Sequence, residues 1–426
     1  MPLLNNIVSS IKIGWANLNN DDNLTMLTFL SVSYVFLIFL NSDMLSNSIF
    51  SEQVQLFGIT SVPATTLFII ILASSSCVSL FVGAFFSKKY SHRLQFGSAL
   101  IGLAFSFLLY LPLKGESFLC VYAILAGIVS TIGLVNLLVA FINKTDFSNR
   151  GSTSGIFIFM VYVILFIFMI LLGELRELAI VLVILKIFSL FLSARIKDFN
   201  FDSESKEYIM TSDKIKISFL GVWAIFIVSD IAVVTYLNFL QSIRIYFPMP
   251  IEMLSLISQI IGLVTMVIGG IVMDIYGRKR PMMLSFVYLG ANYALISFSG
   301  GGLNWFTAVD GIAWGILSVL FILILWGDIC KPSKRTMWMA ASLSISIMIY
   351  PGTVVAPHIL SLFSTIGTVD QNALFPITSF FLFIAAGIIL TLPETLPEKI
   401  IQKKELEDYI KMAKRVKEKY KNGKKI

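Results

Sequence analysis

The stretch GIVMDIYGRKR, residues 270–280, places one acid and a glycine turn ahead of three consecutive cations, with apolar runs on both sides. A similar stretch, GAFFSKKYSHR at residues 83–93, lies in the first part of the chain, with Ser87 in the place of Asp274. Glycine permits the tight turn that such a short loop needs. The two stretches predict an internal repeat in which a basic loop joins two apolar helices.

The composition is that of a membrane protein. Of the 426 residues, 57% are hydrophobic and only 13% are charged, whereas a soluble domain carries about 25% charged residues. A membrane-spanning helix needs about 20 apolar residues. We therefore predict an all-α integral membrane protein with twelve transmembrane helices in two six-helix halves. The spans are expected at residues 24–47, 61–86, 94–113, 118–142, 152–173, 177–196, 217–241, 252–274, 281–299, 303–327, 335–358 and 373–392.

The distribution of cations predicts the orientation. With these spans, all but four of the 32 Lys and Arg residues fall on one side. Lys114, Arg176 and Arg244 fall on the other side, and Lys186 lies inside a span. Because cytoplasmic loops carry an excess of Lys and Arg, we expect a multi-pass protein of the cell membrane with both termini in the cytoplasm.

Polar segments divide the chain into parts. The longest polar stretch between spans, residues 197–216, is expected to be a cytoplasmic linker between halves at 24–196 and 217–392. Residues 1–23 are expected to form an amphipathic helix on the membrane surface, and the basic tail 393–426 to lie near anionic lipid. The tail and the loops account for the net charge of +7 without a nucleic-acid partner. The three cysteines and two histidines are isolated, so neither a disulfide frame nor a metal or cofactor site is expected.

Three short motifs lie at the ends of expected spans, namely Gly270-x-x-x-Asp274-x-x-Gly277-Arg278-Lys279, Asp328-x6-Arg335 and Pro393-Glu394-Thr395. Together they resemble signatures of the major facilitator superfamily. The first is similar to the loop between spans eight and nine of that superfamily, and the other two are similar to motifs of its sugar-porter branch. The resemblance implies the major facilitator fold, with a central cavity between the two halves lined by spans one, four, seven and ten.

The same resemblance implies a gate on the cytoplasmic side. A loop Asp can accept hydrogen bonds from a neighbouring helix N-terminus and pair with Arg, and the loop is expected to meet the start of span five at residues 151–153. The first half departs from the pattern, because Ser87 and Asn143-x6-Arg150 lack the acids. We expect the second-half residues to dominate gating, with Asp274 beside Arg278 and Asp328 beside Arg335; alternatively, these charges only fix topology. The gating candidates are Gly270, Asp274, Gly277, Arg278, Lys279, Asp328, Arg335, Arg150 and Glu394.

Three ionisable residues lie inside spans, where they are costly and therefore functional candidates. Asp230 lies in span seven and Asp310 in span ten, both of which the resemblance places at the cavity. Either could carry the coupling proton, or it could hold helices together through hydrogen bonds. For Lys186 we expect a structural role. The candidates for binding the solute, which could equally bond between helices, are Tyr34, Asn41, Asn238, Gln241, Gln259, Asn292 and Trp314.

These observations favour a secondary active transporter that works as a monomer and moves a small organic solute, such as a sugar or another metabolite, by proton-coupled symport. Span seven lacks the paired-Gln signature of the sugar-porter branch, so a sugar is not established. One alternative is an exporter of apolar or cationic compounds, which the 36 Phe residues favour. Another is a receptor or membrane partner that has lost transport, which the incomplete first-half motifs favour. No arrangement of nucleophile, His cluster or phosphate loop indicates an enzyme.

Overall fold

The structure is a bundle of long helices with one small hairpin. The computed structural model describes residues 2–39, 53–56, 60–108, 116–171, 175–196, 211–242, 251–298, 308–349, 352, 374–396, 406, 410 and 413. The helices are α1 (Pro2–Asn20), α2 (Asp22–Phe39), α4 (Ala64–Leu108), α5 (Glu116–Thr131), α6 (Leu134–Lys144), α7 (Arg150–Leu171), α8 (Leu175–Arg195), α9 (Asp213–Ser242), α10 (Ile251–Tyr276), α11 (Lys279–Phe298), α12 (Gly311–Val319), the π-helix η3 (Leu320–Ile324), α13 (Leu325–Ile329), α14 (Pro332–Ile347) and α16 (Leu374–Thr391). Strands β1 (Gln53–Leu56) and β2 (Thr60–Pro63) pair antiparallel.

Each of the twelve expected spans contains a described helix, so the predicted all-α membrane architecture is confirmed. Eight described helices are long and apolar enough to cross a membrane, and the apolar helix Asp22–Ile38 is slightly shorter. The second expected span begins at Ala64 instead of residue 61, because β2 occupies residues 60–63. The ends of some expected spans, such as residues 40–47 and 353–358, lie outside the described residues.

Three parts of the chain are more irregular than the apolar pattern predicts. Spans two and three form the single helical run α4, which bends at Tyr90, where φ is −129° and ψ is 33°. Span four breaks between α5 and α6 at Gly133, where an added Cβ would lie 2.1 Å from the Tyr34 hydroxyl. Span ten is divided into α12, η3 and α13. Hydrophobic periodicity does not report such local changes, since all these segments remain apolar.

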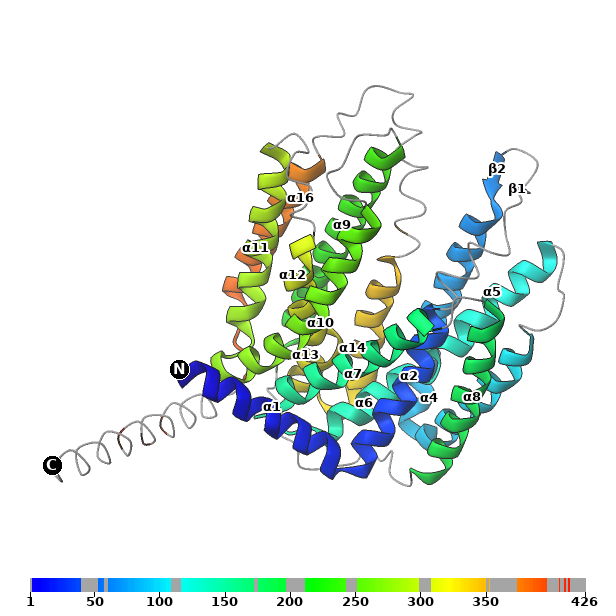
Figure 1. Ribbon diagram of the computed structural model, residues 1–426, viewed down its shortest axis with the longest axis horizontal. Coiled ribbons are helices and arrows are strands. Elements are labelled where there is room, and N and C mark those ends of the chain that lie inside the picture. The colour runs from blue at the N-terminus through cyan, green and yellow to red at the C-terminus, as the bar shows by residue number, and fades with distance from the viewer. Residues whose placement is uncertain are drawn as a thin grey trace.

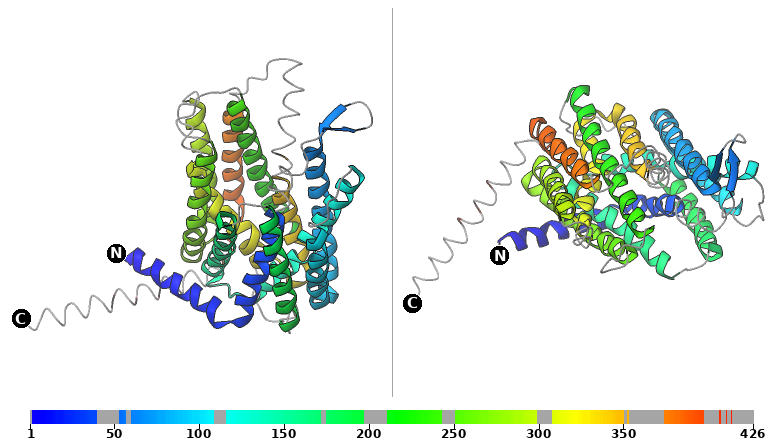
Figure 2. Two further views of the ribbon diagram at one scale, coloured as in Figure 1. Left: turned by 45° about the vertical axis from the view of Figure 1, so that its right-hand side comes forward. Right: turned by 90° about the horizontal axis from the view of Figure 1, so that it is seen from above.

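The helices form two groups that lie side by side. In Figures 1 and 2, α9, α11 and α16 of the second half lie on one side, and α4, α5 and α8 of the first half lie on the other. The halves touch most closely where α7 meets α10, because a Cβ on Gly270 would lie 2.1 Å from the Gly151 carbonyl oxygen. Glycine is required here for close approach of two backbones.

The expected N-terminal helix is present as α1, and Figure 1 shows it lying across one end of the bundle. Its Gly14 packs against Ser152 and Ile156 of α7, since an added Cβ would lie 2.8 Å from the Ile156 side chain. Val8 and Trp15 on a neighbouring face are exposed. The helix therefore has one apolar strip on the protein and one that is free to contact lipid, an arrangement that suits a helix on a membrane surface.

Candidate functional site

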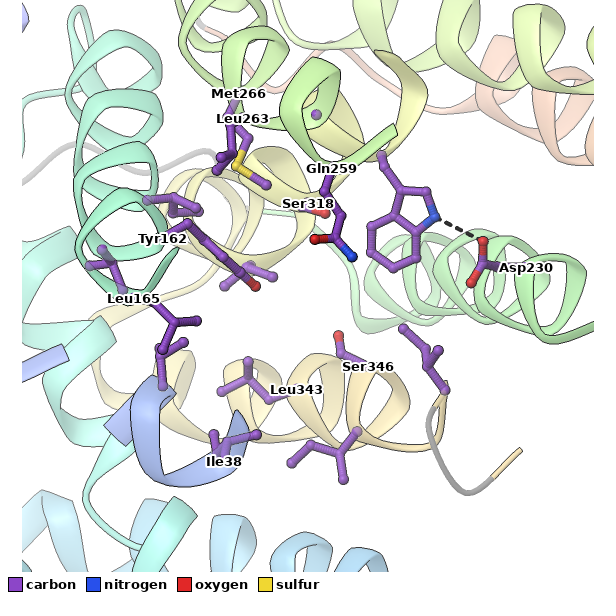
Figure 3. A pocket seen from close by; sticks show the side chains of 18 of the residues that line it. Ile38, Tyr162, Leu165, Asp230, Gln259, Leu263, Met266, Ser318, Leu343 and Ser346 are labelled. Carbon is purple, nitrogen blue, oxygen red and sulfur yellow. Dashed lines mark hydrogen bonds between the residues drawn. The ribbon is translucent and has the colours of Figure 1, made fainter. Parts of the chain in front are cut away.

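A large cavity lies between the two halves. Its volume is about 970 Å³, which is suited to a drug-sized molecule. The first half contributes residues of α2, α4, α5, α6 and α7, and the second half contributes residues of α9, α10, α12, η3 and α14. Figure 3 shows Ile38, Tyr162 and Leu165 facing Asp230, Gln259 and Ser318 across the open space. Spans two, five, eight and eleven therefore contribute as well as the four spans that were expected.

Two carboxylates reach this cavity, and both belong to the second half. Asp230 of α9 accepts a hydrogen bond from the Trp314 indole nitrogen at 2.9 Å, drawn as the dashed line in Figure 3. Asp310, directly before α12, is buried and accepts a hydrogen bond from the Asn292 side-chain amide. In the described residues neither carboxylate has a Lys, Arg or His partner. Both proton-coupling candidates thus lie where a solute could reach them.

The other candidates for binding the solute fall into three groups. Gln259 and Trp314 line the cavity as expected. Asn292 lies behind the lining and holds Asp310 in place. Asn41 lies outside the described residues, and Asn238 and Gln241 lie in α9 but their side chains are not described.

Tyr34 does not line the cavity, in contrast to the expectation. Its side chain is fully buried inside the first half, where the Gln95 amide donates a hydrogen bond to its hydroxyl at 3.1 Å. Helix α2 turns Ser31, Val35 and Ile38 toward the cavity instead. The sequence did not show in which direction Tyr34 of α2 faces.

Lys186 lies in the same interior region of the first half. Its ammonium nitrogen is 4.4 Å from the centre of the Tyr34 ring, and the side chain is fully buried. It has no hydrogen-bond partner among the described residues and does not line the cavity. This geometry fits a cation–π contact that joins α8 to α2.

Several lining residues were not anticipated. Trp223 of α9 stacks on Phe321 with ring centres 4.7 Å apart, and its indole nitrogen donates to the Ser342 carbonyl and the Ser346 hydroxyl at 3.2 Å each. Tyr162 of α7 also lines the cavity. The sequence carries a weak signal for these residues, because each is an aromatic side chain with a polar atom in the middle of a span. Such a polar atom needs a hydrogen-bond partner when it is buried.

At one end of the bundle the two halves are joined by buried charges. We name this the basic end and define it by Arg150, Arg278 and Arg335. Asp274 of α10 accepts hydrogen bonds from the backbone nitrogens of Gly151 at 2.8 Å and Ser152 at 2.7 Å, at the start of α7. It also accepts one from Arg278 at 2.7 Å. The contact of this loop with residues 151–153 is therefore present, and it places a carboxylate at the positive end of a helix dipole.

Arg278 connects this loop to a second acid. It contacts Asp328 at 3.3 Å and donates to the Phe147 carbonyl of the first half at 3.1 Å. Burial alone would lower the pKa of Arg278, but Asp274 and Asp328 more than offset this and raise it. Arg278 therefore remains a cation in the interior of the basic end.

The pairing of Asp328 differs from the expectation. Asp328 forms an ion pair with Arg150 of the first half, not with Arg335. Arg335 instead donates to the Asn143 side chain of the first half and to the Gly327 carbonyl at 2.9 Å. The two x6 motifs thus exchange partners across the halves, and each Arg binds the acid or amide of the opposite motif.

Glu394 organises the same end from the C-terminal side. Its carboxylate accepts backbone hydrogen bonds from Arg278 at 2.8 Å and Lys279 at 3.1 Å, at the start of α11. Gly277 has φ of +90°, and an added Cβ would lie 2.6 Å from a Glu394 oxygen. In the first half, Ser87 donates only to the Ala84 carbonyl of its own helix, at 2.9 Å.

The described residues contain no group of three or more His, Cys, Asp or Glu that could hold a metal ion. No family model matches the chain, and no curated protein matches it by sequence. The overall architecture, by contrast, closely follows that of known structures.

The chain is similar to several solved transporters. The human organic anion transporter MFSD10 (TETRAN) has 12% identity and a TM-score of 0.60, over 86% of this chain and 99% of that chain. The major facilitator superfamily proton:xylose symporter XylE bound to 6-bromo-6-deoxy-D-glucose has 12% identity and a TM-score of 0.61, over 91% and 96%. A double-tryptophan mutant of XylE has 13% identity and a TM-score of 0.63, over 94% and 99%. The chain therefore has the fold of the major facilitator superfamily.

Proposed function

We propose that the protein is a secondary active transporter that moves a small organic solute across a membrane by alternating access. The observation that carries this proposal is the combination of a cavity between two halves with a charge network that closes one end of it. A non-transporting receptor would need the cavity, but it would not need ion pairs and hydrogen bonds between the halves that close one end of the cavity. The chain is accordingly a transport protein and not an enzyme.

The basic end acts as the gate on the cytoplasmic side. Asp274 binds the start of α7 and Asp328 binds Arg150, so both acids of the second half hold groups of the first half. Separating the halves at this end would break these contacts together. Closure would then favour a cavity that faces the opposite side of the membrane.

Protons supply the coupling through Asp230 and Asp310. Both carboxylates face the cavity and have neutral hydrogen-bond donors, so protonation would remove a charge that is costly to keep inside a membrane. Of the similar structures, XylE is a proton:xylose symporter and MFSD10 an organic anion transporter. Their fold supports transport.

Transport in proteoliposomes tests this function. The purified protein would be screened for uptake of sugars, carboxylates and cationic dyes, with and without an imposed pH gradient. We expect at least one solute to move faster with the gradient, and Asp230→Asn to lose that acceleration. Asp213→Asn, which changes an exposed acid at the start of α9 away from the cavity lining, is the matched control. If no solute moves under any condition, the protein is not a transporter.

A further inference from the structure

The charge in the central cavity has one sign. The described lining residues include Asp230 and Asp310 but no Lys, Arg or His. Lys186, the buried cation of the first half, faces the Tyr34 ring outside this lining. An anionic solute would therefore meet two carboxylates and no compensating cation.

The partners of the two carboxylates are neutral. Asp230 has the Trp314 indole, and Asp310 has the Asn292 amide. An ionised carboxylate without a counter-charge costs several kcal/mol in a medium of low dielectric. Each acid in this cavity must therefore be neutralised by a proton or by a cation that enters from water.

The remaining wall is mainly apolar and aromatic. Opposite Asp230 the first half presents Ile38, Leu165 and the aromatic ring of Tyr162 (Figure 3). On the second half, the Trp314 ring lies beside the carboxylate that it binds. The wall also carries neutral Ser, Thr and Gln side chains that could bond sugar hydroxyl groups. Two acids without a cation in the described lining nevertheless favour an apolar body bearing one positive charge, which would match both the surface and the acids. Aromatic faces add cation–π attraction.

Given the transport function proposed above, we propose that the solute is an amphipathic organic cation whose charge binds Asp230 beside Trp314, and that a proton competes with it for this carboxylate. When the cation binds, the Asp230 proton leaves to water; when the proton returns, the cation is released. The cycle is then an exchange of cation for proton, in place of the symport that the sugar-porter resemblance implies. One positive charge replaces another at every step, so the Asp230 carboxylate always carries either a proton or the bound cation.

Few other titratable groups face this part of the cavity. They are Asp310 before α12 and Tyr162 on α7, with Tyr288 and Tyr293 of α11 behind the lining beside Asp310. The lining residues of α10 and α14 are neutral, and their polar members are Ser255, Ser258, Gln259 and Ser346. None of the phenols ionises near neutral pH, so a pH dependence of cation binding would report the two carboxylates.

The test compares two ions that share size and shape but differ in sign. Tetraphenylphosphonium and tetraphenylborate would be titrated into the protein in nanodiscs, with protein-free nanodiscs as the background. We expect saturable binding of the phosphonium only, with release of one proton into a weakly buffered medium. The Kd should rise by about tenfold for each unit by which the pH is lowered, in the range where Asp230 is mostly protonated. Equal binding of the borate, or phosphonium binding without proton release, would overturn the proposal.

Variants and flux separate this proposal from the transport function. Asp230→Asn should weaken phosphonium binding at least about tenfold and abolish the proton release, while Asp213→Asn changes neither. The wild-type ion comparison does not depend on whether the variant folds. Binding with proton release but no flux in proteoliposomes would refute transport and leave the ligand class standing. Flux of sugars or anions without phosphonium binding would refute the ligand class and leave transport standing.

Discussion

The proposed gate at the basic end should be weakened by the single substitution Asp274→Asn. In the closed arrangement the Asp274 carboxylate accepts the backbone N–H groups of Gly151 and Ser152 at the start of α7. Hydrogen bonds to a charged acceptor contribute about 1.5–3 kcal/mol each, against about 0.5–1.5 for neutral ones. Asparagine retains one acceptor oxygen and turns an NH2 group toward the second backbone N–H. We therefore expect a loss of about 3 kcal/mol.

This loss falls on the closed state alone. The contact with α7 joins the two halves, whereas the contact of Asp274 with Arg278 lies within the second half and does not depend on contact between the halves. Since 1.4 kcal/mol is a factor of ten, about 3 kcal/mol raises the ratio of open to closed protein by about 100-fold. Ser87→Ala should leave the ratio unchanged, because Ser87 bonds only to its own helix.

Cys330 provides a reporter for this ratio. It is fully buried at the basic end, and burial raises the pKa of its thiol to about 12, so the closed state holds no reactive thiolate. In a background with Cys77 and Cys120 replaced by Ser, Asp274→Asn should accelerate maleimide labelling of Cys330 by about 100-fold. Equal labelling rates in the Asp274→Asn and Ser87→Ala proteins would show that the acid does not hold the gate.

Three further changes address the basic end and the interior of the first half. Asn143→Asp should turn the neutral link to Arg335 into an ion pair and slow Cys330 labelling; faster labelling would contradict the exchanged pairing of the two motifs. Gly277→Ala should lower stability by about 1–3 kcal/mol, seen as a lower Tm, since φ is +90° and the new methyl meets Glu394; an unchanged Tm would refute this. Lys186→Met should keep or raise the Tm, because it removes a buried charge without an acid partner among the described residues; a large decrease would point to a polar partner that the described contacts do not include.

Sequence reasoning identified what depends on residue type and order. The apolar runs predicted the spans from local composition. The contact of Asp274 with the start of α7 was expected from the resemblance of its loop to the major facilitator signature, and general chemistry supplied only that a loop acid can accept hydrogen bonds at a helix N-terminus. The two cavity carboxylates were likewise visible, since an acid in an apolar run stands out.

The features that the sequence did not show depend on which helix surfaces pack against each other in the folded protein. Asp328 could have paired with any Arg at the basic end, and only the packing of the halves brings Arg150 to it and leaves Arg335 for Asn143. Tyr34 was expected at the cavity, but its hydroxyl accepts a hydrogen bond from Gln95 inside the first half. The local sequence pattern predicts which residues share one face of a helix. Tertiary packing determines which part of the protein that face contacts.

The irregular span ten connects the cavity with the gate. Asp310 stands at its start and Asp328 near its end, about five turns apart in a regular α-helix with 3.6 residues per turn, which would place both acids on one face. The π-helix η3 takes more residues per turn, so it rotates Asp328 away from the face of Asp310. One acid can then face the cavity while the other faces Arg150. A change of charge at Asp310 and a change of pairing at Asp328 therefore act on one helix, and the π segment between them is where its hydrogen bonding departs from the α-helical pattern.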